Sequence, residues 1–370
     1  MLKNPILYSA FVILSAVVGL IGCERDDSEP DLEMRKFTRL YISYEEYGTS
    51  NLGVPDTNIR VVYPADSSEF GLSLRHVSGA RGGGPMLLAS FADGQRRLLQ
   101  ASVNSGGSND TSVYVMDVGQ TGVLTNIRNG WMSNRLFTYV KGLAYSRRAD
   151  MLFFVNGDGS NNSGIYGISQ PRLRLGYTRP LKKYRTPGLR MWGAAYESDR
   201  LFTSNLGSNP GIFVFEEVND TPVGADSSAV LRPARTLTIR EATNLRGLFY
   251  DTVNNVLAIT DFTDGRTLGS GKIFLFDNFS DLIEQEGDIT PSRVITGPST
   301  GLIQPVDVVV DTRENGVYLY VADRASRRVS RFRISDNGNV APDKYIETTE
   351  EAYGKQATPV GLALDTRSPQ

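Results

Sequence analysis

Cysteine, histidine and excess positive charge are nearly absent from this chain of 370 residues. A single cysteine, Cys23, excludes an internal disulfide, so the folded part depends on burial of apolar side chains. A single histidine, His76, excludes sites in which several histidines hold a metal. No Gly-x-Ser-x-Gly elbow accompanies His76, so we interpret it as an ordinary strand or loop residue. The formal net charge of −2 lacks the basic footprint that nucleic-acid binding requires.

The amino terminus has the features of an exported lipoprotein. Lys3 precedes an apolar run from Pro5 to Gly22, and Cys23 follows directly. This length and the small residue before the cysteine predict a secretory signal peptide over residues 1–22. The Leu-Ile-Gly-Cys sequence that ends at Cys23 resembles the lipobox of bacterial lipoproteins. The resemblance implies that Cys23 carries acyl chains that hold the mature protein on a membrane. The alternative is an uncleaved anchor in which Cys23 has no role.

Residues 23–36 form an acidic segment, with six acidic residues between positions 24 and 33. Charge repulsion and a shortage of apolar residues predict a disordered tether. The segment also resembles the acid-rich export signal of surface lipoproteins in the Bacteroidetes phylum, although a solvated spacer has the same composition. We therefore expect a lipid-anchored protein of the bacterial outer membrane, on the cell surface or the periplasmic side.

One short strand pattern recurs through the remaining sequence. The copies begin about 50 to 60 residues apart, a period typical of a supersecondary unit repeated along the chain. They are Gly142–Tyr145, Gly193–Tyr196, Gly247–Tyr250, Asp307–Val310 and Gly361–Leu364. The repeat predicts a single domain over residues 37–370.

Each copy opens a unit of four predicted strands, A to D. In the clearest unit, strand A covers 247–250, strand B 256–260 and strand C 272–276, and strand D begins at 293. Short β-branched and aromatic runs between Gly, Asn, Asp and Pro are typical of strands. An earlier, less regular unit is expected over 86–128.

Four-stranded units of this length predict an all-β fold, a β-propeller with one unit per blade. The chain ends on a strand A at 361–366 and begins with strands at 40–44 and 59–62 that resemble B and C. Joining both termini completes one blade and leaves no open sheet edge. The sequence therefore predicts six four-stranded blades. A seventh would have to lie within 45–140.

The blade at 300–345 resembles an NHL-type repeat, through Pro305–Asp311, Tyr320–Asp323 and Arg328–Phe332. Three other blades match this pattern less closely, and the segment before residue 130 matches poorly. The family includes protein-binding, RNA-binding and enzymatic propellers, so the resemblance implies a fold and leaves the function open.

Bases and an aromatic residue precede several A strands and should open toward one face. An aromatic residue among bases is suited to an acidic or sugar-like ligand, although rim packing and ordinary surface charge are the alternative. The candidate face consists of Lys141, Arg190, Trp192, Arg246 and Gln304.

Polar residues occupy the end of strand B in four units, namely Asn156, Asn205, Asp261 and Asp323. Such side chains cap turns by accepting hydrogen bonds from backbone amides. Alternatively they form a ring of oxygen ligands, as in propellers resembling gluconolactonase and SMP-30, which would imply calcium or magnesium. No matching set of ligand positions can be identified, and Lys141 and Arg246 would disfavour a cation at the channel mouth.

Two hypotheses about function follow. The first is a lipid-anchored, non-catalytic binding scaffold with a protein or carbohydrate partner. The second is a metal-dependent hydrolase or lyase of the gluconolactonase kind, acting in the central channel. The sequence predicts no catalytic residue, nucleotide cofactor or redox centre.

Overall fold

The structure is a computed structural model that describes residues 38–48, 57–91, 93–103, 110–157, 163–350 and 355–366. The predicted signal peptide (1–22), the acidic tether (23–36) and Cys23 lie outside the described residues. Within the described ranges, no helix is both long and apolar enough to cross a membrane.

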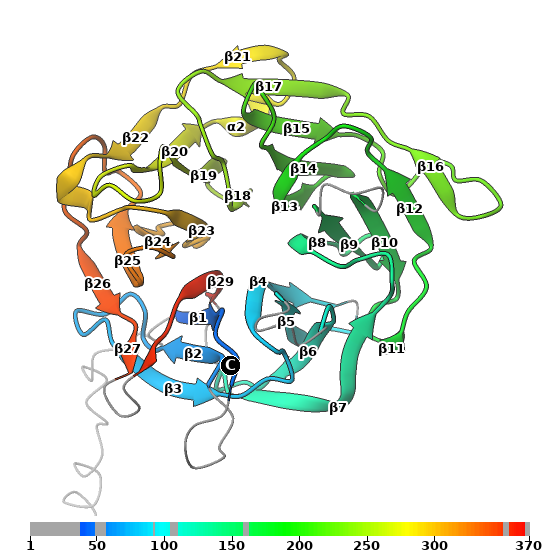
Figure 1. Cartoon of the computed structure of the whole chain (residues 1–370), viewed down its shortest axis with the longest axis horizontal. Helices are drawn as coiled ribbons and strands as arrows, with labels where there is room; N and C mark the ends of the chain where they lie inside the picture. The colour runs from blue at the N-terminus through cyan, green and yellow to red at the C-terminus, as the bar shows by residue number, and fades with distance from the viewer. Residues whose placement is uncertain are drawn as a thin grey trace, which may run out of the picture. The chain divides into compact units, whose positions relative to one another are not determined.

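Six small, mainly antiparallel sheets stand in a ring, as Figure 1 shows, and each sheet is one blade of a β-propeller. The predicted six-bladed, all-β fold is therefore confirmed. In every blade the first strand is innermost and the later strands follow outward.

The blades are numbered here in chain order. Blade 1 contains β4 (Gly83–Ser90), β5 (Arg96–Ser102), β6 (Val113–Val118) and β7 (Leu124–Ser133). Blade 2 contains β8 (Val140–Ser146), β9 (Met151–Asn156), β10 (Gly164–Ser169) and β12 (Lys182–Arg185). Blade 3 contains β13 (Met191–Glu197), β14 (Arg200–Asn205), β15 (Gly211–Phe215) and β17 (Arg235–Ile239).

Blade 4 contains β18 (Leu248–Asp251), β19 (Val256–Phe262), β20 (Gly271–Asp277) and β22 (Arg293–Thr296). Blade 5 contains β23 (Pro305–Val310), β24 (Tyr318–Asp323), β25 (Arg328–Arg333) and β26 (Lys344–Glu347). Blade 6 contains β29 (Pro359–Asp365), β1 (Arg39–Tyr44), β2 (Ile59–Val62) and β3 (Leu72–His76). Short elements outside this scheme are α2 (Phe279–Leu282), η2 (Pro298–Thr300) and the pair β27 (Thr349–Glu350) and β28 (Lys355–Gln356).

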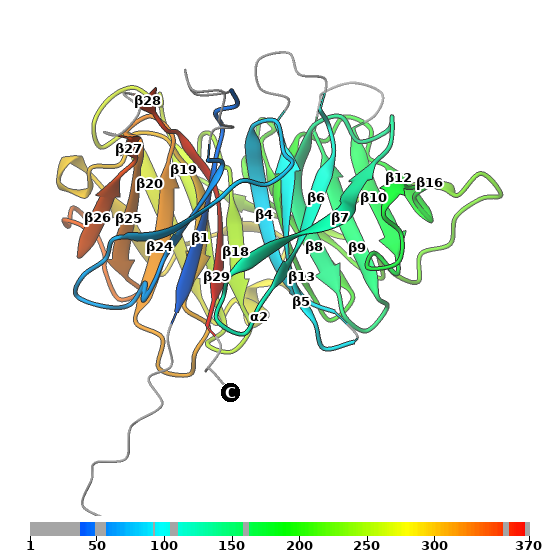
Figure 2. The same ribbon diagram turned by 90° about the horizontal axis from the view of Figure 1, so that it is seen from below.

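Blade 6 is closed by both ends of the described chain, as the sequence predicts. The innermost strand β29 runs antiparallel to β1, with Leu40 opposite Leu364 and Ile42 opposite Leu362. Figure 2, turned by 90°, also shows β1 and β29 side by side. The closure pairs β1 on both sides, with β29 and with β2, so β1 is not left as an open edge.

Three blades carry a fifth strand, which corrects the expectation of four strands in every blade. The additional strands are β11 (Gly176–Tyr177), β16 (Ser228–Val230) and β21 (Gly287–Ile289). In the sequence, each of these strands comes between the third and fourth strands of its blade. In space, it pairs in parallel with the outer strand of the preceding blade. These segments therefore tie the rims of blades 1 to 4 together.

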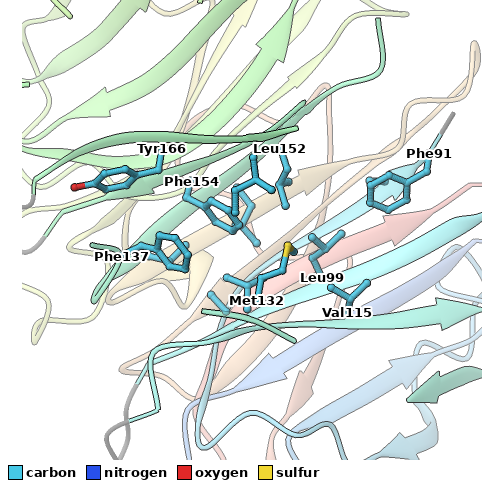
Figure 3. Packing of buried hydrophobic residues seen from close by; sticks show 14 residues of the cluster. Phe91, Leu99, Val115, Met132, Phe137, Leu152, Phe154 and Tyr166 are labelled. Carbon is cyan, nitrogen blue, oxygen red and sulfur yellow. The ribbon is translucent and has the colours of Figure 1, made fainter. Parts of the chain in front are cut away.

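The apolar core lies between neighbouring blades. Both faces of a blade are covered, so central strands such as β9 and β19 are buried at every position. Figure 3 shows one inter-blade cluster, in which side chains of blade 1 meet those of blade 2. There the rings of Phe137 and Phe154 stack with centroids 5.0 Å apart. His76 ends β3, and its Nε2 lies 2.9 Å from Asn126 Oδ1 on β7, between blades 6 and 1.

Candidate functional site

The innermost strands of all six blades surround a central cavity of about 770 Å³. Its walls come from β4, β8, β13, β18, β23 and β29, together with the loops at their ends. A cavity of this volume is of the size that holds a small organic molecule.

A ring of glycines lets the inner strands approach one another at this cavity. A Cβ on Gly142 would lie 2.6 Å from the carbonyl carbon of Gly193, and one on Gly361 would lie 2.3 Å from the oxygen of Gly84. Such distances exclude a side chain unless the backbone moves. The recurring glycine of the sequence pattern is therefore explained by close contact between blades. In blade 5 the equivalent position is occupied by Asp307. Asp307 pairs with Ala322 and Gly142 pairs with Val155, and each partner is the second-to-last residue of the second strand of its blade.

One end of the cavity carries a cluster built on Trp192, the second residue of β13. The Nζ atom of Lys141, from blade 2, lies 4.3 Å from the centroid of the Trp192 ring. The guanidinium carbon of Arg246, from the entry to blade 4, lies 4.6 Å from the same ring. Three consecutive blades thus bring two cations against one indole, a favourable cation–π arrangement.

Of the other predicted face residues, Gln304 also lines the cavity, whereas Arg190 is exposed and is not among the lining residues. Two further lining residues were missed by the sequence argument, which considered only positions before strand A. Arg324 follows β24 and donates from Nε and Nη2 to the two carboxylate oxygens of Glu45, at 2.8 Å each. Arg324 directly follows Asp323, at the end of strand B, where only side chains with acceptor oxygens were considered.

Burial and like charge both act on the cations of the cluster. Burial lowers the pKa of Lys141, and the neighbouring charge of Arg246 lowers it further. Burial likewise lowers the pKa of Arg246, to about 10. Among the described residues, neither side chain forms an ion pair, and the one hydrogen bond of the Arg246 side chain goes to the carbonyl oxygen of Leu245 at 2.8 Å. The cluster therefore keeps positive charge available to a ligand.

Asp307 places a carboxylate in the cavity wall. One oxygen accepts the N–H of Val308 at 3.0 Å, and the other accepts the N–H of Leu362 at 2.8 Å. Burial raises its pKa to about 7, against the lowering effect of these hydrogen bonds. The buried carboxyl group therefore holds its proton to a higher pH than an exposed aspartate does. In the sequence, Asp307 stands out only because it occupies the position where the other repeats have glycine.

The four polar residues at the ends of strand B accept hydrogen bonds from backbone amides, and none of them lines the cavity. The pairs are Asn156 with Tyr139 N–H (2.8 Å), Asn205 with Gly207 N–H (2.8 Å), Asp261 with Thr243 N–H (2.9 Å) and Asp323 with Ile303 N–H (2.7 Å). In three of the four pairs the donor lies in the segment that leads into strand A of the same blade. Burial raises the pKa of Asp261 and of Asp323. In the part of the chain that the structure describes, no three His, Cys, Asp or Glu residues gather where they could hold a metal ion.

Comparison with known proteins gives structural neighbours only. No protein-family profile and no curated protein matches the sequence. Among solved structures, a "putative 6-phosphogluconolactonase" of Bacteroides fragilis aligns with a TM-score of 0.52 and 12% identity, over 91% of this chain and 100% of that one. A protein of the same description from Bacteroides uniformis aligns with a TM-score of 0.53 and 12% identity, over 90% of this chain and 100% of that one. At this identity the likeness shows the fold alone.

Proposed function

We propose that this propeller binds a small organic anion of the acidic-sugar class in its central cavity. The observation that carries the proposal is the pair of cations, Lys141 and Arg246, held on Trp192 without a direct ion pair to any described residue. A carboxylate or phosphate group would supply the missing negative charge and accept charge-assisted hydrogen bonds from both. The amide of Gln304, also in the cavity wall, is suited to sugar hydroxyls.

We further propose that the propeller is a binding protein held at the bacterial outer membrane by acyl chains on Cys23. The lipobox-like sequence supports this anchor, and the acidic segment at 23–36 would hold the propeller away from the membrane. An exported, anchored protein with a ligand cavity fits the capture of small acids from the surroundings.

A second candidate function is hydrolysis of a lactone of such an acid. The favouring observation is Asp307, whose pKa of about 7 suits a general base that takes a proton from water. Both structural neighbours are also described as a "putative 6-phosphogluconolactonase". In this candidate the cations hold the acidic group, and the Asp307 carboxylate faces the water that attacks the lactone carbonyl.

The test is titration of the full chain with 6-phosphogluconate and gluconate, followed by calorimetry and by the fluorescence of Trp192. Both acids should bind, and neutral glucose should not. Changing Trp192→Ala together with Arg246→Ala should weaken binding about 100-fold, as expected for loss of two favourable contacts, and leave folding intact. Arg190→Ala, at an exposed position of the same entry region, is the matched control and should bind like wild type.

Equal binding by the double variant and wild type, or no binding of either acid, would contradict the proposal. Lactone hydrolysis is followed separately, with 6-phosphogluconolactone as substrate. Loss of hydrolysis in Asp307→Asn with retained binding of 6-phosphogluconate would favour the second candidate. If the wild-type protein does not hydrolyse the lactone, the second candidate is excluded and binding remains the proposed function.

A further inference from the structure

We infer that Lys141 is a reactive amine that forms an imine with acids that also carry an aldehyde or ketone. The inference rests on the proposed anion site and narrows its ligands to oxo acids and open-chain sugar acids. It requires an amine that reaches the cavity, loses its proton readily and has no competing partner. The structure meets each requirement at Lys141.

The position of the amine comes from the start of β8, where Lys141 lines the cavity. Its Nζ atom lies near two aromatic rings, 4.3 Å from the centroid of Trp192 and 5.6 Å from that of Tyr139. The rings attract the ammonium form, but burial disfavours its charge and is the larger effect on Lys141. The net effect favours release of the proton, which gives the nucleophilic amine.

Other buried or partly buried lysines are held by acceptors. The Nζ of Lys182 donates to the carbonyl oxygen of Thr221 at 2.7 Å, and that of Lys272 to the carbonyl oxygen of Glu241 at 2.8 Å. Lys183 donates to the carbonyl oxygen of Asp226 at 2.7 Å. Among the described residues, Lys141 has neither a hydrogen-bond acceptor nor an ion-pair partner. Its lone pair is therefore free to react once the proton has left.

The charges around Lys141 also disfavour its ammonium form. Arg246 shares the Trp192 ring, and Arg324 is close enough to contribute. Glu45 opposes them, but both of its carboxylate oxygens accept hydrogen bonds from Arg324. Burial is the largest cause of the lowered pKa of Lys141, followed by Arg246. A desolvated lysine beside another cation is a recognised form of activated nucleophile.

The reaction balances without an added oxidant or reductant. The neutral Lys141 nitrogen attacks the carbonyl carbon, and one amine proton moves to the carbonyl oxygen to give a carbinolamine. The second amine proton then moves to the hydroxyl group, which leaves as water, and a C=N bond replaces the C=O bond. Meanwhile the guanidinium of Arg246 pairs with the carboxylate of the same ligand and holds its carbonyl near the amine.

The test uses the full chain with glyoxylate, the smallest oxo acid, and cyanoborohydride, which reduces an imine to a stable carboxymethyl-amine. Peptide mapping should place one carboxymethyl group on Lys141 at neutral pH, before Lys344 is modified, although Lys344 is exposed on β26. Lys141→Gln should abolish this product. Arg246→Gln should slow it about tenfold, the effect of losing one charge-assisted hydrogen bond. Lys344→Gln is the matched control and should leave it unchanged.

If the exposed Lys344 is carboxymethylated before Lys141, the labelling depends on solvent exposure alone, and the inference is overturned. Gluconate carries the acid group but no aldehyde or ketone, so it separates the two proposals. Gluconate binding without labelling of Lys141 would overturn the imine and leave the anion site standing. Labelling of Lys141 that gluconate does not slow would instead contradict the anion site, because the two acids should compete there.

Discussion

The carboxylate of Asp307 accepts a hydrogen bond from the backbone N–H of Leu362 at 2.8 Å. Asp307 lies on the innermost strand of blade 5 and Leu362 on the innermost strand of blade 6, which both ends of the described chain complete. Beside this bond, Gly361 packs so closely on Gly84 that a Cβ would lie 2.3 Å from its oxygen. The closing blade is therefore fixed on both sides at the cavity.

Asp307 predicts a pH dependence of stability. Burial raises its pKa from an ordinary value of 3.8 to about 7, so between these values the folded state binds a proton that the unfolded chain has released. Its contribution to stability is full below about pH 4, declines as the pH rises, and is lost above about pH 7. Each unit of pKa difference corresponds to about 1.4 kcal/mol, so the decline amounts to a few kcal/mol.

The variant Asp307→Asn tests the predicted pH dependence of stability, because the Asn amide stays uncharged over the whole pH range. Urea unfolding at pH 5 and pH 8 should show wild type losing free energy of unfolding as the pH rises, with a smaller loss in the variant. The Asn oxygen can replace one of the two backbone hydrogen bonds, so the variant should be slightly less stable at pH 5. An identical pH dependence in both proteins would show that Asp307 is not the titrating group.

The glycine ring predicts intolerance to a single methyl group. Gly142→Ala would place Cβ 2.6 Å from the backbone of Gly193 in the next blade, where no side chain can move aside. We expect a loss of about 1–3 kcal/mol, typical of overpacking. Gly119→Ala is the matched control, since its Cβ would meet only the carbonyl oxygen of Val123 at an ordinary 3.4 Å. Similar melting temperatures for both variants would contradict the tight contact.

A buried arginine predicts a large loss of stability on truncation. Arg331, only 2% exposed, donates from Nη1 to the carbonyl oxygens of Ala65 (2.8 Å) and Ser67 (2.7 Å) and from Nε to Asp343 (2.8 Å). Its guanidinium also lies 4.3 Å from the ring centroid of Tyr318. Arg331→Met would leave these acceptors unpaired and should cost about 3–5 kcal/mol.

Urea unfolding measures this loss directly. Arg333→Met is the matched control on the same strand, because Arg333 is exposed and its backbone remains in β25. That variant should stay within about 0.5 kcal/mol of wild type, as surface changes usually do. If both variants unfolded alike, the contacts between blade 5 and residues 65–67 would not be stabilising.

The sequence predicted the inner strands well because the same crowded position recurs in each blade. Gly142, Gly193, Gly247 and Gly361 mark that position, and the requirement for glycine is visible without a structure. The rim strands could not be predicted in this way. The strand β16 has three residues, none of them buried, so it has no periodic apolar signal.

The candidate site was predictable in part. Lys141, Trp192 and Arg246 each directly precede the recurring glycine, and this shared place in the repeat brings them together at one end of the cavity. Arg190 lies just before β13, two residues ahead of Trp192, and remains exposed, which the shared place in the repeat does not predict. Asp307 was missed because its environment depends on Leu362, which is distant in sequence.

The closure of blade 6 by both ends of the described chain predicts that β29 is required for cooperative folding. Ending the chain before β29 would remove the partner of β1 and uncover Leu40 and Ile42, which are fully buried. The remaining strand edge would be open and apolar, so we expect loss of the cooperative unfolding transition and self-association, measured by urea unfolding and light scattering. A chain ending at Thr366 keeps the whole of β29 and should behave like wild type. Cooperative unfolding of the shorter chain, as a monomer, would mean that the other five blades are stable without closure of the sixth.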